Sequence, residues 1–221
     1  RTILKEASLQ FGGGSLMVNG MVSHQKKNNH FNVKLNANKV NSAELLRAFD
    51  NFGSKVLTPK SVSGQFFVSG VLDGYFDNAI NLIQRSLTGN LKLTLNNGAL
   101  NQFEPLRRIG KYAFPFRNFD RVTIDPLVIN IAFKNGFANI APTPINTSVF
   151  NFDLAGSYGF YGNSNMQLDV HLRDPAKDKE ITNKKVVQEN RKKGITLHLQ
   201  AIEEGNAPFK IKLRYKNDKL Q

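Results

Sequence analysis

The sequence predicts a mainly β protein: a curved, mostly antiparallel sheet that forms an open groove or a sandwich, with two short helices. Three observations predict this class. Apolar and polar residues alternate over many stretches, as at Leu91, Leu93 and Leu95, and such alternation puts the two kinds of side chain on opposite faces of a strand. Glycine and asparagine turn signals separate these stretches at short intervals. Strands do not alternate with long helices, so a parallel sheet is not expected.

The N-terminal part of the chain predicts four strands and one helix. The strands are expected at Ile3 to Phe11, Ser15 to Val22, Phe31 to Ala37 and Val62 to Phe76. A turn at 12–14 consists of three glycines, which adopt positive φ at little cost. Asn41 is a helix cap with Glu44 three residues later, and Leu45, Leu46 and Phe49 share one face of this helix, which Gly53 ends.

The remainder predicts further strands and a second helix at Phe103 to Lys111, with Pro105 in its first turn. Asn96, Asn97 and Gly98 predict a hairpin turn after the strand at Asn90 to Leu95. The other expected strands are Asp120 to Phe133, Phe137 to Ile140, Phe150 to Leu154, Met166 to Leu172, Ile195 to Ala201 and Phe209 to Tyr215. The total is about ten strands and two short helices, within the size of one all-β domain.

A charged segment at 174–194 interrupts this pattern and is predicted to be a loop, with a frayed helix near Val186 as the alternative. Its cations define a candidate contact with an anionic surface: Lys184, Lys185, Arg191, Lys192 and Lys193. The chain of 221 residues carries a net charge of +13, but many lysines occupy the polar positions of strands. That placement favours a solvated sheet face over a dedicated polyanion site.

Catalytic and metal-binding motifs are not found. The four histidines, His24, His30, His171 and His198, have no metal-ligand spacing, and their polar positions predict surface residues. Aromatic residues and lysines fall on opposite faces, which disfavours base stacking and therefore nucleic acid. The lack of Trp argues mildly against a carbohydrate-binding module. We expect no enzyme activity and no cofactor, and a role in binding or structure.

Two stretches resemble a known family. The segment GNLKLTLNNGALNQFEPL, from Gly89 to Leu106, and FNVKLNANKVNSAELLRAF, from Phe31 to Phe49, are similar to the C-terminal region of AsmA-family proteins (AsmA/TamB-like, in the bridge-like lipid-transfer superfamily) of Gram-negative bacteria. The resemblance implies that residues 1–221 form a single AsmA-like β domain, a piece of a longer envelope protein. It implies a periplasmic location, with an inner-membrane anchor in a segment outside this chain.

The function that this resemblance implies is non-catalytic: binding or channelling lipid acyl chains in outer-membrane biogenesis. A phospholipid or another acyl-chain ligand would be the partner, and a membrane surface or envelope proteins are further candidates. The apolar positions of the clearest strands are the candidate lipid-binding residues: Leu91, Leu93, Leu95, Ile129, Ile131, Phe133, Phe150, Phe152, Leu168 and Val170. Each of them is equally compatible with an ordinary hydrophobic core. The alternative function is therefore a structural or protein-interaction domain with a filled core.

Overall fold

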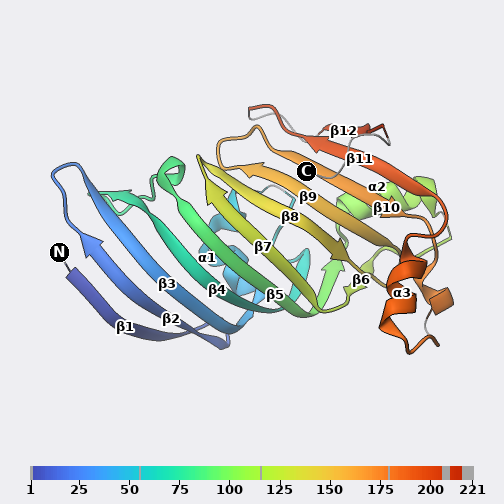
Figure 1. Cartoon of the computed structure of the whole chain (residues 1–221), viewed down its shortest axis with the longest axis horizontal. Coiled ribbons are helices and arrows are strands. Elements are labelled where there is room, and N and C mark those ends of the chain that lie inside the picture. The colour runs from blue at the N-terminus through green and yellow to red at the C-terminus, as the bar shows by residue number, and fades with distance from the viewer. Residues whose placement is uncertain (1, 55, 115, 179, 206–209, 216–221) are drawn as a thin grey trace.

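The twelve strands of the described residues belong to one antiparallel sheet, which the computed structural model of the chain shows as an open, twisted surface (Figure 1). The structure describes residues 2–54, 56–114, 116–178, 180–205 and 210–215. The strands follow one another in sequence order, except that β6 pairs with β5 beside β7. The mainly β, antiparallel class expected from the alternation of residues is confirmed.

The strands have these bounds: β1 Thr2–Phe11, β2 Gly14–Ser23, β3 Asn28–Asn41, β4 Val62–Asp77, β5 Thr88–Asn101, β6 Arg121–Ile124, β7 Leu127–Lys134, β8 Phe137–Ile145, β9 Asn151–Gly159, β10 Asn165–His171, β11 Thr196–Ile202 and β12 Lys210–Leu213. The turns at 12–13 and at 135–136 adopt positive φ, as their glycine and asparagine residues predict. The expected strand at 120–133 is two strands, β6 and β7, separated at 125–126.

The predicted hairpin turn at Asn96 to Gly98 is wrong, because β5 continues through these residues to Asn101. Asn97 has a φ of 52°, and the pairing between β4 and β5 shifts register opposite it, between Ser63 and Gln65. The Asn-Asn-Gly signal therefore produces a bulge inside a long strand. Beyond this bulge, the end of β5 pairs with β6, while its earlier part pairs with β7.

Two helices cover part of one sheet face, which we call the apolar face (Figure 1). Helix α1, Ser42–Ala48, is capped by the side chain of Asn41, as predicted, and it buries Leu45 and Leu46. Phe49 was expected on the same buried face, but it lies at the C-cap and is 54% exposed. A 3-10 turn, η1, Asp50–Gly53, follows. Helix α2, Glu104–Ala113, has Pro105 in its first turn, as predicted, and its Leu106 is buried.

The hydrophobic core forms two clusters on this face. The larger cluster joins α2 to β5, β7, β9, β10 and β11 and contains a stack of phenylalanines. Phe150 is 0% exposed, and its ring centroid lies 5.5 Å from that of Phe114 and 6.0 Å from that of Phe119. The smaller cluster joins α1 to β3 and β4 through Val40, Leu45 and other residues. Part of the apolar face is thus filled by the protein's own side chains.

The segment predicted as a charged loop, 174–194, contains a 3-10 turn, η3, Pro175–Asp178, and a third helix, α3, Lys184–Arg191. A helix near Val186 was expected within this loop, but as a frayed one; the structure has a capped α-helix of eight residues. Asn183 caps α3 by accepting hydrogen bonds from the backbone N–H groups of Lys185 and Val186. Another 3-10 turn, η2, Gln84–Ser86, lies between β4 and β5. Within the described residues, no helix combines the length and apolar character that crossing a bilayer requires.

Candidate functional site

Strand register shows which predicted lipid-binding residues share a face. Leu91, Leu93 and Leu95 of β5 lie opposite Ile131, Ile129 and Leu127 of β7, and Phe152 of β9 lies opposite Val170 of β10. Cross-strand partners in an antiparallel pair project to the same side. Because Leu95 packs in the cluster with α2 and Leu93 packs against the cluster with α1, that shared side is the apolar face.

The ten candidates then divide by burial. Four lie inside the larger cluster, each at most 6% exposed: Leu95, Phe150, Phe152 and Val170. Four more pack against the margins of a cluster: Leu91, Leu93, Ile129 and Leu168. Two lie outside both clusters and are half-buried, Ile131 and Phe133. The first four are core residues that no ligand reaches without unfolding. The predicted site is therefore reduced to the part of the apolar face that lies outside this core.

Beyond the two clusters, half-buried apolar side chains continue across the sheet. We call this region the apolar strip; it consists of Val33, Leu72, Ile131, Phe133, Ile140 and Met166. Val33 lies opposite Leu72, and Ile131 lies opposite Ile140, so the strip extends from β3 and β4 to β7, β8 and β10. Sequence analysis named two of these six residues, Ile131 and Phe133, as lipid-binding candidates; strand register adds the other four.

On two strands that the strip crosses, β5 and β9, the position facing the strip is a glycine and carries no side chain. Gly89 of β5 lies opposite both Leu72 and Phe133, and Gly156 of β9 lies opposite Ile140 and Met166. Their φ angles are 131° and 134°, a region that L side chains rarely adopt. A Cβ on Gly89 would lie 2.1 Å from the carbonyl oxygen of Val71. The neighbouring strand therefore approaches too closely for any side chain at this position.

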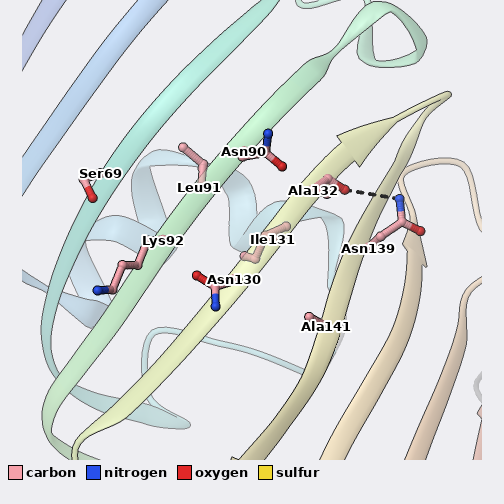
Figure 2. A pocket seen from close by; sticks show the side chains of 9 residues that line it. All are labelled: Ser69, Asn90, Leu91, Lys92, Asn130, Ile131, Ala132, Asn139 and Ala141. Atoms are coloured by element: carbon pink, nitrogen blue, oxygen red, sulfur yellow. Dashed lines mark hydrogen bonds between the residues drawn. The ribbon is translucent and has the colours of Figure 1, made fainter. Parts of the chain in front are cut away.

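Two hollows described for this molecule both open on the opposite side of the sheet, which we call the polar face. The larger has a volume of about 490 Å³ and is lined by residues of β4, β5, β7 and β8, among them Asn90, Lys92 and Asn130 (Figure 2). Neither hollow is the apolar groove that the sequence predicted.

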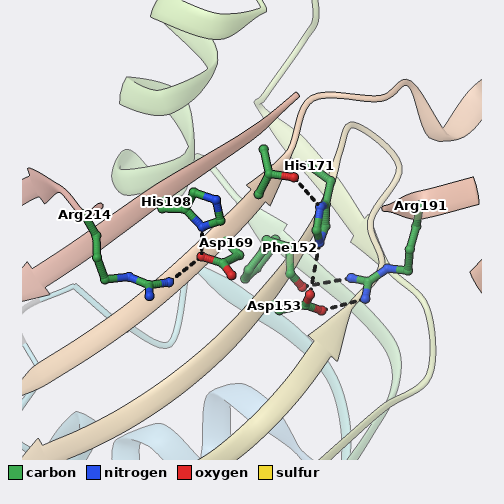
Figure 3. Close-up of polar contacts among 8 residues, drawn as sticks. Phe152, Asp153, Asp169, His171, Arg191, His198 and Arg214 are labelled. Atoms are coloured by element: carbon green, nitrogen blue, oxygen red, sulfur yellow. Dashed lines mark hydrogen bonds and ion pairs between the residues drawn. The ribbon is translucent and has the colours of Figure 1, made fainter. Parts of the chain in front are cut away.

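A network of charged side chains lies near the ends of β9, β10 and β11, and sequence analysis missed it (Figure 3). Asp153 of β9 lies 3.0 Å from Nε2 of His171 and accepts a hydrogen bond of 2.6 Å from Nη1 of Arg191. Nδ1 of His171 lies 3.1 Å from the hydroxyl of Thr196. His171 is 5% exposed and Arg191 is 3% exposed. The prediction of a surface position for His171 is wrong.

Electrostatics explains why Asp153 remains ionised in this setting. Burial raises its pKa, but hydrogen bonds from His171 and Arg191 and the charge of Arg191 outweigh burial, so the pKa lies below its ordinary value. A hydroxyl, an imidazole and a carboxylate in series resemble the parts of a nucleophilic site. Here, however, Arg191 occupies the carboxylate, and its Nη2 donates to the carbonyl of Phe152. The arrangement joins the end of α3 to the sheet.

This result changes the basic contact predicted at 184–193. Arg191 turns inward to Asp153, whereas Lys185, Lys192 and Lys193 are exposed. The side chain of Lys184 lies outside the described part of the molecule. Three cations therefore remain on the surface of this segment for an anionic partner.

Metal ligation has no support in the described ranges, where no three His, Cys, Asp or Glu side chains are grouped to hold an ion. Comparisons with known proteins are equally silent: no protein-family model, curated protein or solved structure matches this chain. Its functional interpretation rests on the sheet itself.

Proposed function

We propose that this chain is a non-catalytic domain that binds lipid acyl chains on the apolar strip. The observation that carries the proposal is the half-buried state of six apolar side chains that extend from β3 to β10 outside both core clusters. Exposed apolar surface of this extent is costly in water, at about 25 cal/mol per Å². A hydrocarbon chain lying across the strip would remove that surface from water.

The resemblance to AsmA-like proteins supports the biological setting of the proposal. It suggests a periplasmic protein in outer-membrane biogenesis, with phospholipid as the ligand and an inner-membrane anchor supplied by another segment. Acyl-chain binding requires no reacting group, which agrees with a sheet whose titratable side chains serve structural pairing. The gain on covering hydrocarbon is about 0.8 kcal/mol for each methylene group, so even partial contact gives measurable binding.

The test is titration of the purified protein with a fluorescent fatty acid, together with lipid extraction and mass spectrometry of the protein as isolated. Ile131→Gln places an amide in the strip and should weaken fatty-acid binding about tenfold, in line with ~1.5–3 kcal/mol for one apolar side chain. Val128→Gln is the matched control, since Val128 lies on the polar face of the same strand, β7, and is 44% exposed.

Equal affinity in the wild-type and Ile131→Gln proteins, both still folded by circular dichroism, would rule out acyl binding at the strip. A second candidate function then gains support, that of a structural or protein-interaction domain. Its favouring observation is that Leu95, Phe150, Phe152 and Val170 fill the core. In that case the extract contains no lipid, and a partner protein covers the strip.

A further inference from the structure

The polar face carries a trough made of two adjoining hollows. The larger, of about 490 Å³, and the smaller, of about 350 Å³, share Ser69 of β4 and Lys92 of β5. Together they cross five strands, from β3 to β8. They follow a row of cross-strand partners: Asn36 lies opposite Ser69, Ser69 opposite Lys92, and Lys92 opposite Asn130. A continuous line of polar residues therefore forms the floor of the trough.

The lining is mixed, with apolar residues such as Leu91, Ile131 and Ala141 beside the row of polar ones. Its polar residues are Asn36, Asn38, Ser69, Asn90, Lys92, Thr94, Asn130 and Asn139. Asn139 donates to the carbonyl of Ala132 and accepts from the hydroxyl of Ser157. In the described part of the chain, the side chains of Asn36, Asn90 and Asn130 make no such bonds, so their donors and acceptors are free for a ligand. Each asparagine offers both a donor and an acceptor, a combination that matches neighbouring hydroxyl groups.

The charged side chains of the polar face that have no ion-pair partner include three lysines. Lys34, Lys92 and Lys134 alternate with the apolar-face residues of β3, β5 and β7, and none forms an ion pair with a described carboxylate. Three carboxylates on the same face are already bound. Asp73 contacts His30 and Asn32, Asp153 contacts His171 and Arg191, and Asp169 contacts His198 and Arg214. No carboxylate lines either hollow.

One aromatic ring completes the trough. Phe67 of β4 lines the smaller hollow and is half-buried among Asn36, Asn38 and Thr94. A phenylalanine ring surrounded by amides can pack against the apolar face of one sugar ring, so this contact does not require a Trp. Binding of single-stranded nucleic acid instead depends on several aromatic side chains that stack successive bases. The described lining has one such ring, which favours a saccharide.

We propose that the trough binds an anionic saccharide chain, with the asparagines on its hydroxyl groups and Lys92 on its negative group. Lys92 has the central position, because both hollows include it. Lys92 and Asn130 lie on the opposite face from the apolar strip, so substitutions there test this site independently of the acyl-chain site, while Ile131 of the strip also lines the larger hollow.

Isothermal titration calorimetry of the whole chain tests the proposal with three probes: a sulfated heparin tetrasaccharide, neutral maltotetraose and an eight-nucleotide single-stranded DNA. The heparin tetrasaccharide should bind at least fivefold more tightly than each of the others. Lys92→Glu should weaken that binding at least tenfold, and Asn130→Ala at least threefold. Lys111→Glu, at an exposed position in the last turn of α2, changes the charge equally and should alter binding by less than twofold.

Several results would overturn the proposal. Undetectable binding of the tetrasaccharide would do so, and equal losses in Lys92→Glu and Lys111→Glu would mean attraction to overall charge alone. Equal affinity for the oligonucleotide would indicate a general polyanion surface. Fatty-acid binding should stay unchanged in Lys92→Glu, which keeps this outcome distinct from failure of the acyl-chain proposal. Urea unfolding of each variant shows that the fold is retained.

Discussion

Asp153 of β9 and Asp169 of β10 lie directly opposite each other in the antiparallel register. Like charges in this relationship repel, which destabilises a sheet. The protein compensates each carboxylate with its own histidine and arginine: His171 and Arg191 for Asp153, and His198 and Arg214 for Asp169, where Nη2 of Arg214 lies 2.5 Å from the carboxylate. These contacts tie α3 and the residue after β12 to the sheet (Figure 3).

Removing one partner of this network should be costly. Arg191→Ala would leave Asp153 with fewer compensating groups in a buried site, and we expect a loss of about 3–5 kcal/mol in the free energy of unfolding. Urea denaturation followed by circular dichroism measures it. Lys192→Ala, one residue further and exposed, should change stability by less than ~0.5 kcal/mol. Similar values for the two variants would mean that Arg191 contributes no more than a surface cation.

Acid should weaken the protein through the same carboxylates. The pKa of Asp153 is lowered in the folded state, as are those of Asp73 and Asp178, whose hydrogen bonds come from Asn32 and His30 and from Arg173 and Asn190. A carboxyl group with a lowered folded pKa contributes stability above its unfolded pKa of about 3.9, and this contribution is lost as pH falls toward the folded value. The free energy of unfolding should therefore drop between about pH 5 and pH 3.

Asp153→Asn removes one of these groups, so the same measurement should give a shallower decline of stability with acid, from a lower starting value at neutral pH. Identical slopes in the two proteins would show that Asp153 does not participate in the acid response.

Phenylalanines test the filled part of the apolar face. Phe150→Ala removes a fully buried ring that packs against Phe114 and Phe119, and a loss of about 3–5 kcal/mol is expected. Phe116→Ala makes the same chemical change at a side chain that is 100% exposed, so thermal and urea midpoints should stay near those of the wild type. A small effect at Phe150 would contradict a close-packed core under α2.

Glycine at position 89 is required for two reasons that can be separated. Gly89→Ala places a Cβ against the carbonyl oxygen of Val71 and also at a φ of 131°. Gly194→Ala has an unfavourable φ of 96° too, but its Cβ would meet no atom within 4 Å. Backbone strain alone costs about 1–3 kcal/mol, so Gly194→Ala measures that part. A clearly larger loss in Gly89→Ala, measured by urea unfolding, would show the steric effect of close strand approach.

Much of the fold followed from local pattern. Alternation with period two located every strand approximately, and the caps of α1 and α2 were evident from Asn41 and Pro105. The Asn-Asn-Gly sequence led to a wrong prediction of a hairpin turn, because a residue with positive φ is as suitable for a bulge as for a turn. Here the pairing of β5 with β4 on one side and with β6 and β7 on the other makes it a bulge. Local signals cannot distinguish these outcomes.

By itself, the sequence determined that strands would form and that each would have one apolar and one polar side, because side-chain direction depends on nearest neighbours along the chain. The tertiary structure decided what covers each side. Packing of α2 and Phe150 turned four predicted lipid-binding residues into core, and the register of β9 and β10 brought Asp153 to His171 and Arg191. These two contacts of Asp153 join residues 18 and 38 positions apart in the sequence. They depend on how distant segments are brought together, which local sequence patterns do not reveal.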